Sequence, residues 1–349
     1  MKFIHFGCWN NGNCSTDGAN GLSLTMNKLN SYIEEKKETI DKIEFIVIAG
    51  DNYYPPKGTT KKFIEADFIS GFKCLPEEIP KYLIFGNHDI EDVITDESGN
   101  EIKCKTLTEQ INFTSDKPSF TVFNEVLFKK VNNTLIIMLD TNLYNIKIIS
   151  KPINQTCYSR LFNGLINNST LTLKDLIDYQ NLFIENILKS NSEVENIIFI
   201  GHHPIYAIKA KKDKDGVVNK AELKIPKFID FFKDIKPMLS GKQIYYLCAD
   251  THIYQQGIVK ILPDLEIKQY IVGTAGAPQD AIYTSDDVSC NTIEEDGQIV
   301  YRKSIEKKEF GFLTVDINDL GLSLEFISVN PPMLGGGMKR YKIKNMRLL

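Results

Sequence analysis

Residues 42–54 read KIEFIVIAGDNYY, an apolar run that stops at glycine and is followed at once by Asp51 and Tyr54. Runs of this length, rich in Ile and Val and ended by glycine, are typical of buried β-strands. Residues 1–7 (MKFIHFG) have the same form, and residues 22–37 between the two runs carry apolar side chains at helical spacing. A strand, a helix and a strand predict a βαβ unit with two parallel strands.

The same alternation continues along the chain. Further strands are predicted at residues 81–85, 135–139, 197–200 and 244–248, and further helices at 61–71, 173–189 and 226–232. From residue 265 onward apolar and polar residues alternate with a period of two, which indicates antiparallel strands. No linker or repeat interrupts the sequence, so we predict one α/β domain over residues 1–349, with a C-terminal tail over about 333–349.

Polar clusters follow five of the predicted strands directly. They read CWNN, DNYY, NHD, HHP and ADTH, and they hold four of the five histidines in the chain. A single Asp or Asn after a strand commonly belongs to a turn. In open α/β sheets, however, the ligand crevice lies outside the carboxyl ends of the strands. Five clusters delivered to that edge therefore predict one shared site.

The side chains in these clusters suit a transition-metal site. Carboxylate, amide oxygen, imidazole and phenol form a mixed oxygen and nitrogen set, which favours zinc, manganese or iron over calcium or magnesium. Two such metals held about 3.5–4 Å apart can clamp the attacking and leaving oxygens of a phosphoryl displacement. We therefore expect hydrolysis of a phosphate ester by a metal-bound hydroxide at a two-metal site.

Composition narrows the partners and the compartment. The formal net charge of −4 gives no basic field for nucleic acid. No run approaches the roughly 20 apolar residues of a membrane span, and the first residues lack the features of a secretory signal. The seven cysteines are odd in number and lack CxxC spacing, which favours reduced thiols and a cytoplasmic protein, or a virion or host-cell one if the source is viral. Nothing in the sequence indicates an oligomeric state.

The ordered motifs GDNYY, GNHD, GHHP and YLCADTH resemble those of the purple acid phosphatases of the tartrate-resistant type, within the calcineurin-like metallophosphoesterases. The similarity extends to MLDTN (138–142), VGTAGA (272–277) and GFLTVDI (311–317). It implies a four-layer α/β/β/α sandwich with the metals at one edge of two packed sheets. It also implies iron paired with iron, zinc or manganese, and a phosphorylated small molecule or phosphoprotein as substrate.

On the first-metal side, the resemblance implies that Asp51 bridges both metals, that Tyr54 binds as a tyrosinate and that His252 is a further ligand. The family has an aspartate at the position of Cys8. A metal would deprotonate this thiol, so Cys8 is a candidate ligand as a thiolate. Asp17, in the same loop, is an alternative ligand.

On the second-metal side, the resemblance implies that Asn87 and His202 are ligands. Asn87 would also orient the phosphate, and His88 would bind it and protonate the leaving group. Asp250 stands where the family has a histidine, and its carboxylate remains a possible ligand. His203 falls where the family has an aromatic residue.

Three functions remain open on the sequence alone. The first is a phosphate monoesterase, and the second is a scaffold or binding protein on a phosphatase fold that has lost one or both metals. The third is a single-metal hydrolase of diesters or nucleotides. Lys209, Lys211 or Lys212 could neutralise the phosphate, although their run KAKKDKD also suits a solvated loop. The basic tail MKRYKIKNMRLL (338–349) could serve a partner.

Overall fold

The computed structural model describes most of the chain. The described residues are 1–11, 14, 20–39, 41–54, 64–91, 94–95, 101–102, 104–115, 117–122, 126–151, 157, 172–215, 217–283, 288–318, 321–329 and 340–342. Within them, no helix is both long enough and apolar enough to span a bilayer. The alternative ligand Asp17 lies outside these residues, as does the predicted tail except for 340–342.

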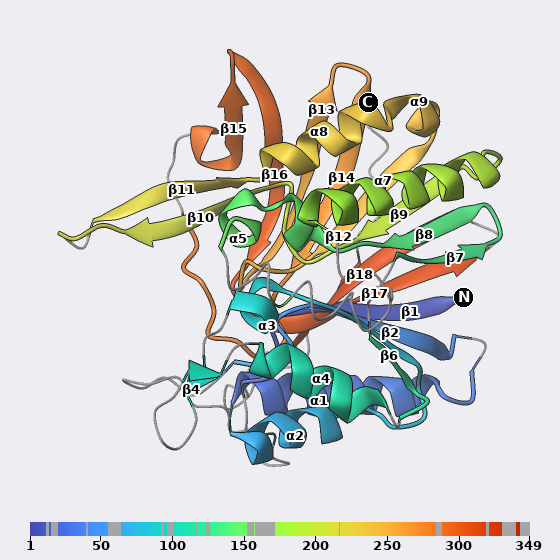
Figure 1. Ribbon diagram of the computed structural model, residues 1–349, viewed down its shortest axis with the longest axis vertical. Coiled ribbons are helices and arrows are strands. Elements are labelled where there is room, and N and C mark those ends of the chain that lie inside the picture. Colours follow the sequence, from blue (N-terminus) through green and yellow to red (C-terminus); the bar gives the residue numbers. More distant parts are fainter. Residues whose placement is uncertain are drawn as a thin grey trace.

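Two large sheets form the centre of the molecule (Figure 1). The first sheet has the order β19 (Arg340–Lys342), β18 (Gly321–Val329), β17 (Phe310–Asn318), β1 (Lys2–Phe6), β2 (Ile43–Ala49), β3 (Lys81–Ile84) and β6 (Phe120–Val122). The second has the order β15 (Thr292–Glu295), β16 (Gln298–Lys307), β13 (Tyr254–Leu262), β14 (Leu265–Val272), β12 (Gln243–Cys248), β9 (Asn196–Ile200), β8 (Thr134–Met138) and β7 (Leu127–Val131). Two short hairpins, β10 (Tyr206–Lys212) with β11 (Val218–Lys224) and β4 (Ile94–Thr95) with β5 (Glu101–Ile102), are separate from both.

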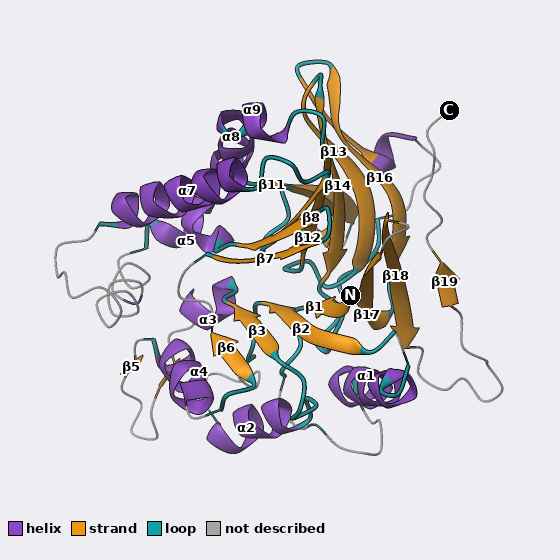
Figure 2. Ribbon diagram, turned by 90° about the vertical axis from the view of Figure 1, so that its right-hand side faces the viewer, coloured by secondary structure: helices purple, strands orange, loops and turns teal. Residues whose placement is uncertain are grey.

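Helices cover the outer face of each sheet (Figure 2). The first sheet carries α1 (Gly21–Lys36), α2 (Glu65–Lys73) and α4 (Lys105–Ser115), and the second carries α7 (Leu173–Ser190), α8 (Pro226–Asp234) and α9 (Lys236–Leu239). Short helical turns are α3 (Asn87–Glu91), η1 (Thr141–Tyr144), α5 (Ile146–Ile149) and η2 (Val288–Asn291). The predicted four-layer α/β/β/α sandwich is confirmed.

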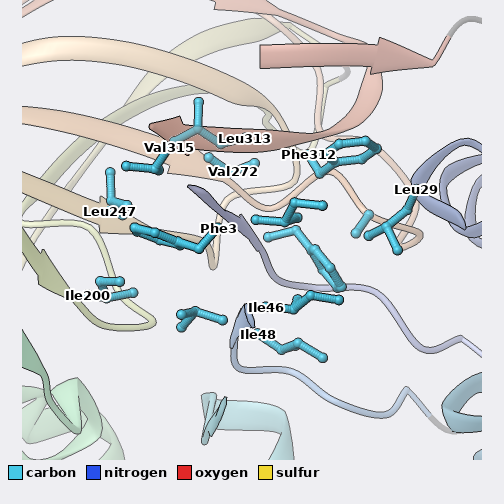
Figure 3. Close-up of a cluster of buried hydrophobic side chains, with 14 of the residues drawn as sticks. Phe3, Leu29, Ile46, Ile48, Ile200, Leu247, Val272, Phe312, Leu313 and Val315 are labelled. Carbon is cyan, nitrogen blue, oxygen red and sulfur yellow. The ribbon is translucent and has the colours of Figure 1, made fainter. Parts of the chain in front are cut away.

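The sheets are held together by apolar side chains from their facing strands. Ile46 and Ile48 of β2 share one fully buried cluster with Ile200 of β9 and Leu247 of β12 (Figure 3). Burying one such side chain stabilises the fold by about 1.5–3 kcal/mol. The continuous apolar runs that predicted the strands are explained by this burial on both faces.

Most predicted elements are present, but the interpretation of the run around Lys209 as a solvated loop is wrong for most of its residues. Residues 209–212 belong to β10, which pairs antiparallel with β11. Of the rest of this run, residue 213 is irregular and residues 214–215 form a turn. Tyr206 and Ile208 are buried, so the inner half of this strand packs against the protein although its outer half is charged. Helix α4 was not predicted.

The prediction of reduced cysteines is wrong for four residues. Cys14 is joined to Cys74, and Cys104 to Cys157, across sequence separations of 60 and 53 residues. Among the described cysteines, Cys8, Cys248 and Cys290 are buried and form no disulfide. Disulfides of this kind persist in oxidising compartments. The cysteine pattern therefore no longer supports the cytoplasmic location inferred from it.

Candidate metal centre

The five motifs meet at the carboxyl ends of five strands from both sheets. β1, β2 and β3 are parallel neighbours in the first sheet, and β9 and β12 are parallel neighbours in the second. Hydrogen bonds then join the motif loops to one another. The Cys8 N–H donates to the Gly50 carbonyl at 3.0 Å, and the Ala249 N–H donates to the His202 carbonyl at 2.8 Å.

Three non-glycine residues of the motifs have left-handed backbone conformation. The φ angles are 53° at Cys8, 52° at Asp51 and 59° at Asp250. Each follows a strand within two residues, so the chain turns sharply and directs these side chains into the site. Aspartate visits this region more readily than most residues, and cysteine has no such preference. Strained backbone of this kind is commonly found at functional sites.

Asp51 lies at the centre of the site, and its two oxygens face different neighbours. Oδ2 accepts a hydrogen bond from the Tyr54 hydroxyl at 2.6 Å and lies 3.8 Å from Cys8 Sγ. Oδ1 accepts the backbone N–H of His88 at 3.0 Å and lies 3.4 Å from His202 Nε2. This carboxylate therefore connects two sets of side chains.

Glycine is needed beside Asp51 for steric reasons. A Cβ atom added to Gly86 would lie 2.2 Å from Asp51 Oδ1 and 2.3 Å from the Asp51 backbone nitrogen. Real Cβ atoms do not approach other heavy atoms so closely, so the GNHD loop could not close on the carboxylate with any larger residue. The glycine of this motif thus positions the chain that carries Asn87 and His88.

The first group consists of Cys8, Asp51, Tyr54 and His252. Ligand atoms of Cys8, Asp51 and His252 all lie within 4.8 Å of one another, and the Tyr54 hydroxyl lies 3.1 Å from His252 Nε2. The Pro278 carbonyl lies 2.9 Å from His252 Nδ1 and can only accept, so Nδ1 carries the proton. Nε2 is then the nitrogen that can bind a metal.

The second group consists of Asn87, His202, His203 and Asp250. Ligand atoms of the two histidines and Asp250 lie within 4.8 Å of one another. His202 Nδ1 donates to the Ala49 carbonyl at 2.6 Å, which leaves Nε2 facing Asn87 Oδ1 at 3.1 Å and Asp250 Oδ1 at 3.8 Å. Burial raises the pKa of Asp250, while the neighbouring imidazole of His202 opposes that rise.

His203 was not predicted to be a ligand. Its ring is buried and is anchored by Thr141, whose Oγ1 lies 3.0 Å from Nδ1 and accepts the backbone N–H groups of His202 and His203 at 3.1 and 2.9 Å. The sequence indicated His203 only by its position in GHHP, directly after His202, the predicted ligand. Adjacent residues after a strand need not share a face, so the sequence could not show that both rings turn toward one site.

Residues 1–254 match the family model of the calcineurin-like phosphoesterases. The chain belongs to this family. No curated protein sequence matches it.

Three solved structures share the fold of this phosphoesterase. GAP50, the anchor in the inner membrane complex of Plasmodium, is 13% identical with a TM-score of 0.53, and the match covers 98% of this chain and 88% of that one. The purple acid phosphatase PPD1 from yellow lupin (Lupinus luteus) seeds is 13% identical with a TM-score of 0.53, covering 98% of this chain and 52% of that one. PhoD is 12% identical with a TM-score of 0.50, and the match covers 98% of this chain and 68% of that one.

Protonation differs between the donors of the phosphoesterase site. Burial raises the pKa of the Cys8 thiol, and the charge of Asp51 adds to this effect. Burial and Asp51 likewise raise the pKa of the Tyr54 phenol. Burial alone would raise the pKa of Asp51, but the His202 and His88 imidazoles and the hydrogen bond from Tyr54 lower it to about 2. The Asp51 carboxylate is therefore ionised, while the thiol and the phenol keep their protons until a cation binds.

The donor set fits two transition metals. The first group offers sulfur, carboxylate, phenol and imidazole, and the second offers two imidazoles, a carboxylate and an amide oxygen. Zinc, iron and manganese accept such mixed ligands, whereas calcium and magnesium prefer oxygen alone. Both groups are built from rigid strand ends with a second hydrogen bond on each of His202 and His252, as is usual for metal ligands.

Of the three predicted lysines, Lys209 alone is tied to the described part of the site. Its Nζ lies 3.4 Å from Asp280 Oδ2, and the same oxygen accepts the backbone N–H of His252 at 3.1 Å. Lys211 and Lys212 are exposed further along β10.

Proposed function

We propose that this protein is a metal-dependent phosphatase that hydrolyses phosphate monoesters at a two-metal site. The observation that carries the proposal is the position of Asp51, with Oδ2 toward Cys8 and Tyr54 and Oδ1 toward His202. A carboxylate with one oxygen toward each of two ligand groups is the arrangement that a bridging ligand requires. The substrate would be a phosphorylated small molecule or a phosphoprotein.

The first metal would be held by Cys8, Asp51, Tyr54 and His252. The family resemblance implies that this metal is iron. The second metal would be iron, zinc or manganese, held by Asp51 together with Asn87, His202, His203 and Asp250. When bound, the two metals would neutralise the phosphoryl oxygens and activate a water molecule as the nucleophile.

In this proposal His88 would donate a proton to the leaving group, and Asn87 would orient the phosphate. Both side chains are half-buried at the start of α3, and Asn87 Oδ1 lies 3.1 Å from His202 Nε2. The His88 ring lies 4.9 Å from the Tyr54 ring, between centroids, next to the first group. A general acid must reach the departing oxygen within hydrogen-bond distance, so the proposal requires the leaving group to lie beside His88.

Asp89 holds the two catalytic loops in place. This buried carboxylate accepts the backbone N–H of Asn52 at 2.9 Å, the N–H of Gly86 at 2.7 Å and the Gln110 amide at 2.7 Å. It therefore joins the loop of Asp51 to the loop that precedes His88 and to helix α4. Burial raises the pKa of Asp89 to about 7, with a further contribution from the charge of Asp51.

A scaffold is the second candidate function, and Cys8 favours it. Its thiol is buried, its pKa is raised, and its backbone keeps a left-handed conformation that suits aspartate better. The fold match to GAP50, which is described as an anchor, also supports this candidate by analogy.

Metal content and hydrolysis of an aryl phosphate distinguish the two functions. We expect protein loaded separately with iron, zinc and manganese to hold two metals per chain and to hydrolyse the ester between mildly acidic and neutral pH. Asp51→Asn should lose both metals and lower kcat/KM by roughly 10³-fold, or ~4 kcal/mol. Asp264→Asn, an exposed carboxylate paired with Lys236, is the matched control. Wild-type protein that binds no metal would support the scaffold and contradict the phosphatase.

A further inference from the structure

We propose that Lys209 binds the phosphoryl group of the substrate and selects doubly charged monoesters over singly charged diesters, with Asp280 holding it in the absence of substrate. This inference rests on the proposed phosphatase function and adds the residue that determines the substrate class. It is carried by the contacts of one segment, residues 278–281, which lies between β10 and the first group.

The segment 278–281 is fixed to His252 by three hydrogen bonds. The Pro278 carbonyl accepts from His252 Nδ1 at 2.9 Å, the Asp280 carboxylate accepts the His252 backbone N–H at 3.1 Å, and the Asp280 N–H donates to the His252 carbonyl at 3.2 Å. Any group held by this segment therefore has a fixed position relative to a metal ligand.

The same segment is fixed to β10 on its other side. The Ala210 N–H donates to the Ala281 carbonyl at 3.1 Å, and Lys209 Nζ lies 3.4 Å from Asp280 Oδ2. The backbone of Lys209 is thus anchored beside the site, while its side chain, 30% exposed, ends in a long ion pair that is open to solvent. Exposed ion pairs of this kind contribute little to stability, so a phosphate can compete for the ammonium group.

Charge explains why this lysine would bind phosphate. Asp51, Asp250 and Asp280 place three carboxylates around the site, and the charge of Lys209 reaches far enough to oppose the burial that raises the pKa of Asp250. A phosphate monoester carries close to two negative charges at neutral pH and a diester carries one. A compact ammonium group with three donors therefore discriminates in favour of the monoester.

The test uses metal-loaded protein and measures both inorganic phosphate binding by calorimetry and the ratio of kcat/KM for aryl phosphate to that for a bis-aryl phosphate. Lys209→Gln should weaken phosphate binding by about 10- to 100-fold, the usual range for a hydrogen bond to a charged group. The monoester preference should fall by about tenfold. Lys209→Arg should retain most of the phosphate affinity and most of the monoester preference. Lys211→Gln, exposed on the same strand, is the control.

Asp280→Asn separates phosphate recognition from a purely structural role. Asparagine can still accept the His252 N–H through its carbonyl oxygen, but it no longer neutralises Lys209. If Lys209 binds phosphate, this variant should bind phosphate as tightly as wild type or more tightly, while Lys209→Gln binds it weakly. Equal weakening in both variants, or no change in Lys209→Gln, would overturn the inference. Wild-type protein that hydrolyses neither ester and binds no phosphate would instead remove the phosphatase proposal and this inference with it.

Discussion

The first and second groups share Asp51 but differ in what a metal must do to bind. The first group contains the Cys8 thiol and the Tyr54 phenol, whose pKa values are both raised by burial. The second relies on imidazoles, an amide and Asp250. A metal entering the first group must displace protons, whereas neutral imidazole binds directly. We therefore expect the two groups to differ in metal preference, although both lie against the same Asp51 carboxylate.

The backbone shows a second difference between the groups. Asp51, which both groups contact, and Asp250 of the second group have left-handed φ angles, which aspartate tolerates. Cys8 of the first group has the same conformation, although cysteine does not share that tolerance. The turn after β1 is therefore left-handed although its residue does not favour that conformation. Hydrogen bonds from Cys8 N–H to Gly50 and from the Ala277 N–H to the Cys8 carbonyl hold this turn from both sides.

Replacing His203 should change metal affinity more than the other substitutions, because it removes a nitrogen donor from the second group alone. His203→Phe keeps an aromatic ring in the buried position and should weaken the second metal by about 100-fold or more, beyond the 10- to 100-fold seen for outer-sphere partners. Zinc titration against a competing chelator measures this. His5→Gln, a buried histidine outside both groups, is the control. Unchanged affinity for both metals would show that His203 only packs against His202.

Restoring a carboxylate at Cys8 should change the first group. Thiolate favours zinc and carboxylate favours iron and manganese, so Cys8→Asp should lower the ratio of zinc to manganese affinity by about 10- to 100-fold. The variant also suits the left-handed backbone, so it should not lose stability through strain. Competition between the two metals, followed by metal analysis, measures the ratio. An unaltered ratio would mean that Cys8 is not a ligand.

Tyr54→Phe should have the smallest effect on affinity and a distinct spectroscopic signature. Removing the hydroxyl deletes one donor and its 2.6 Å hydrogen bond to Asp51 but leaves the ring in place. We expect ferric affinity to fall by about tenfold, or ~1.4 kcal/mol, and the visible charge-transfer absorption of the iron-loaded protein to disappear. If the absorption persists, the phenol does not bind the first metal, and the two groups resemble each other more than we propose.

Much of the fold could be predicted because its central strands are buried on both faces. Continuous apolar runs such as those of β2 and β9 mark such strands directly, and the polar motif after each run marks the edge of the sheet. Helix α4 and the hairpin of β10 and β11 were harder to predict. The hairpin changes from buried to exposed along its length, so residues 206–212 show no single period.

The candidate site was predicted in part for a similar reason. The sequence indicated Asp51, Asn87, His202 and His252, because each directly follows a predicted strand or lies close behind one. It did not indicate the contact of Lys209 with Asp280, which joins residues 71 positions apart. Disulfide pairing was missed for the same reason, since Cys spacing carries no information on spatial distance.

The sequence by itself determined which residues form the buried strands and which polar side chains are delivered to their carboxyl ends, because burial and turn chemistry act over a few neighbouring positions. Only the tertiary structure decided which of those side chains share a group, which way the Asp51 oxygens point, that His203 lies with His202 and Asp250, and that Lys209 lies beside Asp280. These features depend on how two sheets pack and on distances of a few ångströms between distant segments, and such distances arise only when the whole core is assembled.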